Sequence, residues 1–220
     1  MTQALRPLRR ENLRDSVKRA IRSAIISGEM EPGRVYSAPS LGETFGVSPT
    51  PVREAMLDLV REGLVISLPN KGFRVTEVSE SDLDDVAQLR MLIEPPTVRQ
   101  VVGRIDAEEL KRLRRLAQRI VAAAEAGDLI EYIGCDLDFH ITLLSHAGNK
   151  LLLEVVTELR NKTRLLGLTP LLESGRLVES AAEHHVIMDL VEAGKADEAE
   201  AYLRRHIGHV RGLWAAQSEE

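Results

Sequence analysis

The chain has 220 residues, of which 44% are hydrophobic and 3% aromatic, and its formal net charge is −5 at pH 7. This length allows one large domain or two modest ones. The single cysteine excludes an internal disulfide, and no apolar run approaches the roughly 20 residues of a transmembrane helix. The N-terminus lacks the apolar core of a signal peptide. We therefore expect a cytoplasmic protein with no membrane partner.

The charges are distributed unevenly along the chain. Residues 1–76 contain 12 basic and 8 acidic residues, whereas residues 77–220 contain 17 basic and 26 acidic residues. Nucleic acids attract basic surfaces and repel acidic ones. The N-terminal part is therefore the candidate for binding nucleic acid, and the remainder is not.

Two helices are expected at the start of the chain. Residues 13–27 carry apolar side chains at helical spacing, namely Val17, Ala20, Ile21, Ala24 and Ile25. A turn follows at Glu31-Pro32-Gly33. Residues 40–45 then form a short helix that Gly46 closes.

Residues 46–65 predict a turn, a third helix and a glycine stop. One face of this helix is apolar and is formed by Val52, Ala55, Met56, Leu59 and Val60. Thr50 is the expected N-cap, Pro51 the first helical residue, and Gly63 the end. Two short helices joined by a tight turn are typical of a helix-turn-helix, although a helical hairpin of another kind has the same pattern.

A predicted β-hairpin decides between these two interpretations. Residues 65–68 and 73–76 are short strands rich in β-branched and aromatic residues, and residues 69–72 form the turn between them. A hairpin directly after a helix-turn-helix is a wing, and Lys71 lies at its tip. We therefore predict that residues 1–76 form a winged helix-turn-helix DNA-binding domain.

The same stretch resembles the GntR family of bacterial transcription regulators over about residues 10–76. The resemblance rests on residues 26–33, Gly46-Val47-Ser48, residues 50–55 and Glu62-Gly63-Leu64-Val65. It implies a homodimer that binds an inverted-repeat operator in double-stranded DNA. The residues expected to contact that DNA are Ser48, Thr50, Arg53, Lys71 and Gly72, with Arg53 reading bases. Pro49 and Pro39 stand where many relatives carry side chains that can bind DNA, so the operator need not follow the family consensus.

After a short linker at residues 77–79, residues 80–220 are expected to be entirely helical. The segments run over about 81–103, 106–126, 128–147, 149–167, 175–193 and 195–217. Ser81 and Asp106 are candidate N-caps, and Pro95-Pro96 is expected to kink or divide the first segment. Six such segments predict an antiparallel bundle, so the whole protein is mainly α-helical.

A few polar residues stand out in these helices. Asp136 and His140 are four residues apart and share one helical face, and His184 and His206 lie in later helices. One carboxylate and three imidazoles can bind a transition metal such as zinc. Six histidines in 220 residues is an ordinary number, however, so each can equally be a plain surface or core residue.

This half of the chain resembles the FCD effector domain of the FadR-like branch of the GntR family. The motifs are Asp136-x-x-Phe139-His140, Glu183-His184 and Arg204-x-His206. The resemblance implies a divalent metal ion bound by Asp136, His140, His184 and His206, with zinc expected first and nickel, manganese or iron as alternatives. His185 is the rival to His184, because the two are adjacent.

The resemblance also implies a small carboxylate effector at the metal, with Arg90 facing it. A guanidinium can grip a carboxylate through two hydrogen bonds. The alternative for Arg90 is an ion pair with Glu94, four residues later.

The expected function is therefore that of a DNA-binding transcriptional regulator, with repression as the expected mode. A metal-dependent hydrolase with an accessory DNA-binding domain is the competing class, since such a metal can activate water. No general base or nucleophile is evident beside the four residues, and a hydrolase does not account for the winged helix. A DNA-bending protein would not need an acidic helical domain. We expect no enzymatic activity.

Overall fold

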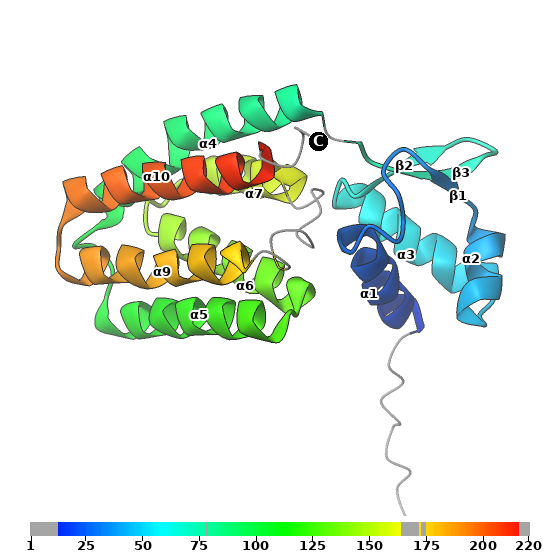
Figure 1. The fold of residues 1–220 in the computed structure, drawn as a ribbon, viewed down its shortest axis with the longest axis horizontal. Helices are drawn as coiled ribbons and strands as arrows, with labels where there is room; N and C mark the ends of the chain where they lie inside the picture. Colours follow the sequence, from blue (N-terminus) through cyan, green and yellow to red (C-terminus); the bar gives the residue numbers. More distant parts are fainter. Residues whose placement is uncertain (1–12, 78, 164–171, 173–174, 216–220) are drawn as a thin grey trace, which may run out of the picture. The chain divides into compact units, whose positions relative to one another are not determined.

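The computed structural model describes residues 13–77, 79–163, 172 and 175–215 (Figure 1). The described residues fall into two compact units. The first contains residues up to 76 except 26–28, and the second contains 26–28 and the residues from 77 onward. Each unit is described by itself below. No helix within the described ranges is long and apolar enough to span a membrane.

The first unit contains three helices and a three-stranded sheet. In chain order its elements are α1 (Leu13–Ile26), β1 (Val35–Tyr36), α2 (Ala38–Phe45), α3 (Pro49–Arg61), β2 (Val65–Leu68) and β3 (Gly72–Val75). The winged helix-turn-helix is confirmed. The sheet order is β1-β3-β2 with antiparallel pairing, and Leu68 pairs with Gly72 beside the hairpin turn. Strand β1 is an addition to the two strands expected, because a two-residue strand has no periodicity of its own.

The predicted start of α3 is wrong by a residue or two. Its N-cap is Ser48 and not Thr50, and the helix begins at Pro49. Proline suits the first helical turn because its fixed φ is already helical and its missing N–H has no partner there. The helix ends at Glu62, followed by Gly63 with a φ of 75°.

A buried carboxylate fixes α3 against α1. Asp58 of α3 accepts hydrogen bonds from Arg14 Nε, at 2.8 Å, and from Arg61 Nη1, at 2.9 Å. The hydrogen bonds from Arg14 hold the pKa of Asp58 below its usual range, against the effect of burial. The apolar face predicted for α3 is buried, including Val52, Ala55, Met56 and Leu59. These contacts hold the helix in one orientation.

The second unit is helical throughout its described residues. Its helices are α4 (Glu80–Val101), α5 (Ala107–Ala126), α6 (Leu129–Ser145), α7 (Lys150–Thr163), α9 (Arg176–Glu192) and α10 (Ala196–Ala215). Figure 1 shows α9 between α5 and α10, with α4 next to α10, in agreement with the contacts between these helices. The predicted all-α bundle is confirmed.

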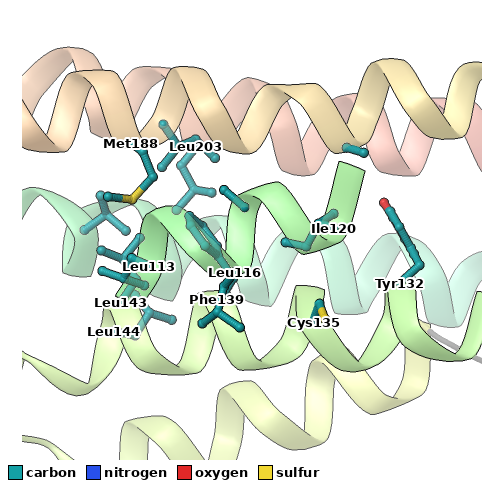
Figure 2. Packing of buried hydrophobic residues seen from close by; sticks show 14 of the residues in the cluster. Leu113, Leu116, Ile120, Tyr132, Cys135, Phe139, Leu143, Leu144, Met188 and Leu203 are labelled. Carbon is teal, nitrogen blue, oxygen red and sulfur yellow. The ribbon is translucent and has the colours of Figure 1, made fainter. Parts of the chain in front are cut away.

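The core of the bundle lies where α5, α6 and α9 meet. Phe139, Leu113, Leu143 and Met188 are fully buried there, as Figure 2 shows from close by. His140, the next residue on α6, is fully buried as well. Phe139 meets the rings of His140 and His184 edge to face, with centroids 5.1 and 5.0 Å apart.

Helix α4 continues through Pro95-Pro96, so the expectation that the prolines divide this segment is wrong. Pro95 cannot donate to the carbonyl of Met91, four residues earlier. That carbonyl instead accepts a hydrogen bond from Arg204 Nη1 of α10, at 3.2 Å. The N-cap is Ser79 and not Ser81, because Ser79 and Asp82 form a reciprocal capping box.

Candidate functional site

The first candidate site is the exposed side of α3 and the wing. Ser48, Thr50 and Arg53 are exposed at the N-terminal end of α3. Arg53 makes no ion pair with any residue that the structure describes, so its guanidinium is available to a partner. Lys71 is exposed at the hairpin tip, where its backbone N–H donates to Leu68 at 3.1 Å. An exposed arginine near a helix N-terminus and an exposed lysine at a hairpin tip are side chains suited to contact bases and phosphates.

Gly72 has a structural reason to be glycine. Its φ is 117°, and a Cβ atom at this position would lie 2.4 Å from the carbonyl oxygen of Tyr36 on β1. The close approach of β1 therefore requires a residue without a side chain. This accounts for Gly72 independently of any contact with DNA.

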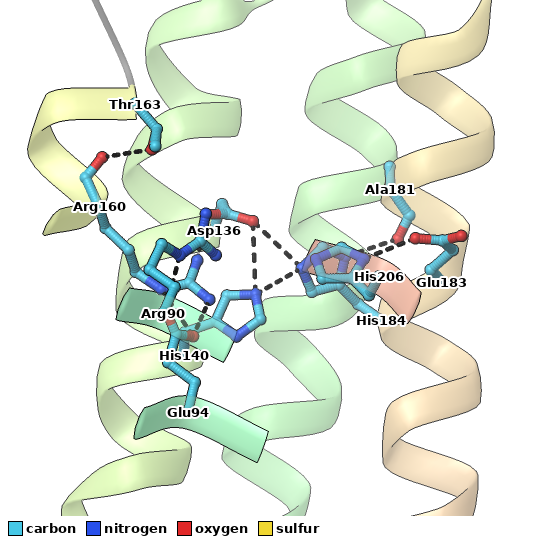
Figure 3. A network of polar contacts seen from close by, with 10 residues as sticks. All are labelled: Arg90, Glu94, Asp136, His140, Arg160, Thr163, Ala181, Glu183, His184 and His206. Carbon is cyan, nitrogen blue, oxygen red and sulfur yellow. Dashed lines mark hydrogen bonds and ion pairs between the residues drawn. The ribbon is translucent and has the colours of Figure 1, made fainter. Parts of the chain in front are cut away.

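The second candidate site lies inside the helical bundle. The metal-binding atoms of Asp136, His140, His184 and His206 all lie within 4.8 Å of one another (Figure 3). The three histidines are buried, and Asp136 is mostly so. Helices α6, α9 and α10 each contribute to the group, so residues 70 positions apart in sequence meet at one point.

The hydrogen bonds of the histidines direct their Nε2 atoms towards the centre of this group. His184 Nδ1 lies 3.0 Å from the carbonyl oxygen of Ala181, which can only accept, so Nδ1 carries the proton. His206 Nδ1 lies 2.6 Å from the Glu183 carboxylate. A ring that carries its proton on Nδ1 alone has a free lone pair on Nε2. His140 Nδ1 is buried and has no hydrogen-bond partner among the described residues.

Only one of the two adjacent histidines belongs to the group. His184 points into the bundle, whereas His185 contributes no ring atom to it; its backbone carbonyl accepts from Arg114. His146 is not in the group either. His209 contacts the other oxygen of Glu183 at 2.8 Å.

Arg90 is paired with Glu94. Its Nε donates to Glu94 Oε1 at 2.7 Å, and both side chains are buried in α4. The ion pair with Glu94, which was the alternative expected for Arg90, is therefore present, and it is buried. Glu94 also accepts two hydrogen bonds from Arg160 of α7, which in turn donates to Asp136 Oδ2 at 3.1 Å. Sequence reasoning missed Arg160 and the central position of Glu94.

Burial and neighbouring charges shift the pKa values of three of the four side chains, Asp136, His140 and His206. Burial, together with the nearby Arg160 charge, holds the pKa of His140 well below its usual value, and burial also lowers the pKa of His206. Burial opposes ionisation of Asp136, yet the contacts with His140, His184 and Arg160 hold its pKa well below the usual range. These directions favour an ionised Asp136 and neutral His140 and His206, which are the forms in which such side chains bind a metal.

Three of the four donor atoms, those of Asp136, His140 and His184, are spaced much as the ligands of one ion are. His184 Nε2 lies 3.1 Å from His140 Nε2 and 3.2 Å from Asp136 Oδ1, and the remaining pair of these atoms is 3.6 Å apart. A tetrahedral zinc ion with bonds of 2.0–2.1 Å would separate its ligands by roughly 3.3 Å.

Comparison with known proteins identifies both units. A model of bacterial regulatory proteins of the gntR family matches residues 13–75, and a model of the FCD domain matches residues 85–209. A Bacillus subtilis protein named uncharacterized HTH-type transcriptional regulator YdhC is 29% identical over 193 residues, covering 86% of this chain and 85% of that protein. The HTH-type transcriptional regulator McbR of Escherichia coli is 26% identical over 179 residues, covering 80% and 81%.

Two further comparisons agree with this. The HTH-type transcriptional repressor NanR of an Enterobacter strain is 27% identical over 234 residues, covering 96% of this chain and 88% of NanR. The solved structure of E. coli McbR/YncC has the same fold, with a TM-score of 0.72 and 24% identity, covering 93% of this chain and 98% of that one. These are regulators and not enzymes, which rules against the hydrolase alternative. The chain belongs to the GntR family of bacterial DNA-binding transcriptional regulators, with an FCD domain following its DNA-binding domain.

Proposed function

We propose that this protein is a repressor whose affinity for its operator is controlled by a small organic acid bound at a divalent metal ion. The ion is held by Asp136, His140, His184 and His206, and zinc is the expected metal. The observation that carries the proposal is the convergence of one carboxylate and three imidazoles inside the helical domain that follows the winged helix in the sequence. Repression is supported by the relatives named NanR, which are named as repressors.

A carboxylate is the effector class that suits this site. Four protein ligands complete a tetrahedral zinc site, so an acid would bind the ion by raising its coordination number to five, or by occupying the open positions of a six-coordinate metal such as nickel, manganese or iron. Arg160 contacts the ligand Asp136 directly and adds positive charge beside the group. Arg90 is bound to Glu94, so it could contact the effector only by sharing its guanidinium between Glu94 and the effector. Arg160 is bound to Glu94 and Asp136 and would also have to share its guanidinium, so both arginines are candidates for contact with the acid.

A chain of buried contacts connects the metal ligands to α4. Asp136 accepts from Arg160, and Arg160 donates to Glu94 on α4. Helix α4 begins at Glu80, a few residues after the winged-helix unit ends at Thr76. An acid that draws Arg160 away from Glu94 would therefore alter the element that leads to the DNA-binding domain. By linkage, effector and operator must then change each other's affinity by the same factor.

The DNA partner is expected to be an inverted repeat bound by a homodimer, in the cytoplasm. One recognition helix reads only a few base pairs, which is too little for a unique site in a genome. Leu89 and Leu92 of α4 and Leu151 and Val155 of α7 are exposed, and these two helices pack together. Exposed leucines on neighbouring helices support association with a second copy.

The proposal is tested by operator binding. An operator is first obtained by selecting DNA that binds the purified protein from a random library. Fluorescence anisotropy then measures the dissociation constant with zinc-loaded protein and with a panel of small organic acids. We expect at least one acid to change the affinity by about 5–150-fold, as is typical of allosteric coupling. His184→Ala should abolish that response, while an acid response that persists in this variant would contradict the proposed site.

A further inference from the structure

Glu183 contacts His206, one of the candidate metal ligands, at the ring nitrogen Nδ1. It lies on α9, immediately before His184, and its side chain is only 16% exposed. Oε2 lies 2.6 Å from His206 Nδ1, and Oε1 lies 2.8 Å from His209 Nδ1 (Figure 3 shows the first contact). Both oxygens of this carboxylate are thus occupied by histidines of α10, one buried and one exposed.

The contact with Glu183 determines which nitrogen of His206 is free. A carboxylate can only accept, so His206 Nδ1 must carry a proton, and in the neutral ring the Nε2 lone pair then faces Asp136 and the other two histidines. A carboxylate bonded to the far side of an imidazole also makes Nε2 a stronger ligand. Burial lowers the pKa of His206, and Glu183 acts in the opposite direction.

The three histidines differ in this respect. His184 Nδ1 contacts a backbone carbonyl, and His140 Nδ1 has no hydrogen-bond partner within the described residues. Of the three, His206 is the one backed by a side-chain carboxylate, so its orientation can be tested by a substitution. His209 stabilises Glu183 from the other side, one helical turn after His206, and its own ring is 61% exposed.

We propose that Glu183 is a positioning residue for the metal centre, which orients His206 and increases the affinity of the site for a divalent ion. This inference rests on the proposed metal site, and it assigns to Glu183 a role that the four ligands do not include. Glu183 would not touch the ion. Its effect passes through the Nδ1 proton of His206.

The test measures metal affinity in matched variants. Glu183→Gln keeps the size of the side chain but removes its charge, and the dissociation constant for Zn²⁺ should rise by about 10–100-fold, measured by competition with a chromophoric chelator. His209→Gln is the control, because it alters the exposed contact of Glu183 and leaves the His206 contact in place; we expect a change below threefold. Glu183→Asp, which keeps the charge with a shorter reach, should fall between the wild type and Glu183→Gln.

A spectroscopic measurement separates positioning from a general effect on folding. Co²⁺ bound to Glu183→Gln should have visible absorption bands that are shifted from those of the wild type, while the metal-free proteins have matching circular dichroism spectra. Wild-type Zn²⁺ affinity in Glu183→Gln would overturn the inference and leave the metal site intact. Equal losses in Glu183→Gln and His209→Gln would also overturn it. A wild type that binds no Zn²⁺ would instead refute the proposed metal site itself.

Discussion

Arg160 is the cation on which the buried charge network depends. Its guanidinium is 3% exposed and donates to Glu94 and Asp136, and Glu94 is completely buried. Arg160→Met keeps much of the apolar stem but removes the charge and leaves Glu94 with Arg90 alone. Removing one partner of a buried ion pair costs about 3–5 kcal/mol. At about 2–4 °C per kcal/mol for a domain of this size, the melting temperature should fall by roughly 6–20 °C.

The control is an ion pair of similar length on the surface. Arg119 Nη2 lies 2.6 Å from Glu131 Oε1, but the two side chains are 56% and 46% exposed. Arg119→Met should therefore cost at most about 1 kcal/mol. Thermal unfolding of both variants is followed by far-ultraviolet circular dichroism at neutral pH, in the presence of a chelator so that metal release does not contribute. Equal shifts in the two variants would refute the claim that burial makes the Arg160 contacts strong.

The remaining predictions concern acid stability, DNA recognition and assembly. The neighbouring Arg160 and Arg90 outweigh burial and lower the pKa of Glu94 from 4.5 to about 2, so its contribution to stability is present above about pH 4.5 and lost as the pH falls towards 2. Acid unfolding of Glu94→Gln should accordingly vary less over this range than that of the wild type. In anisotropy titrations, Arg53→Ala should weaken operator binding by about 1–3 kcal/mol and relax its specificity, whereas Lys71→Ala should weaken binding to all sequences alike. Retained specificity in Arg53→Ala would count against base reading by this residue. Leu92→Glu should shift sedimentation towards the 24.4 kDa monomer without loss of helix, and an unchanged dimer would move the interface elsewhere.

The regular elements could be predicted from the sequence because their signals are local. The apolar stripe of α3 and the N-cap at Asp106 depend only on residues within one or two helical turns. The exact starts of α3 and α4 were missed, since Ser48 and Ser79 compete with serine or threonine neighbours that have the same capping ability. The continuity of α4 through Pro95 depends on Arg204, more than 100 residues later, which no local pattern reveals.

The candidate site was predictable in part for the same reason. Asp136 and His140 share a helical face, and the FCD-like motifs indicated His184 and His206, but the network behind them is tertiary. Arg160 did leave a signal in the sequence, because it lies on the same face of α7 as Val156, Leu159 and Thr163, which are buried. A charged residue within an apolar stripe needs a buried partner. The identity of that partner, Glu94, requires the packing of α4 against α7.

The metal site itself is tested most directly by two adjacent histidines. His184 and His185 are chemically identical neighbours on α9, yet only His184 belongs to the group with Asp136, His140 and His206. The measurement is the metal content, by elemental analysis, of protein purified without chelator. The account predicts about one divalent transition metal ion per chain in the wild type and in His185→Ala, and a loss of this metal in His184→Ala. Metal retained in His184→Ala, or absent from the wild type, would contradict it.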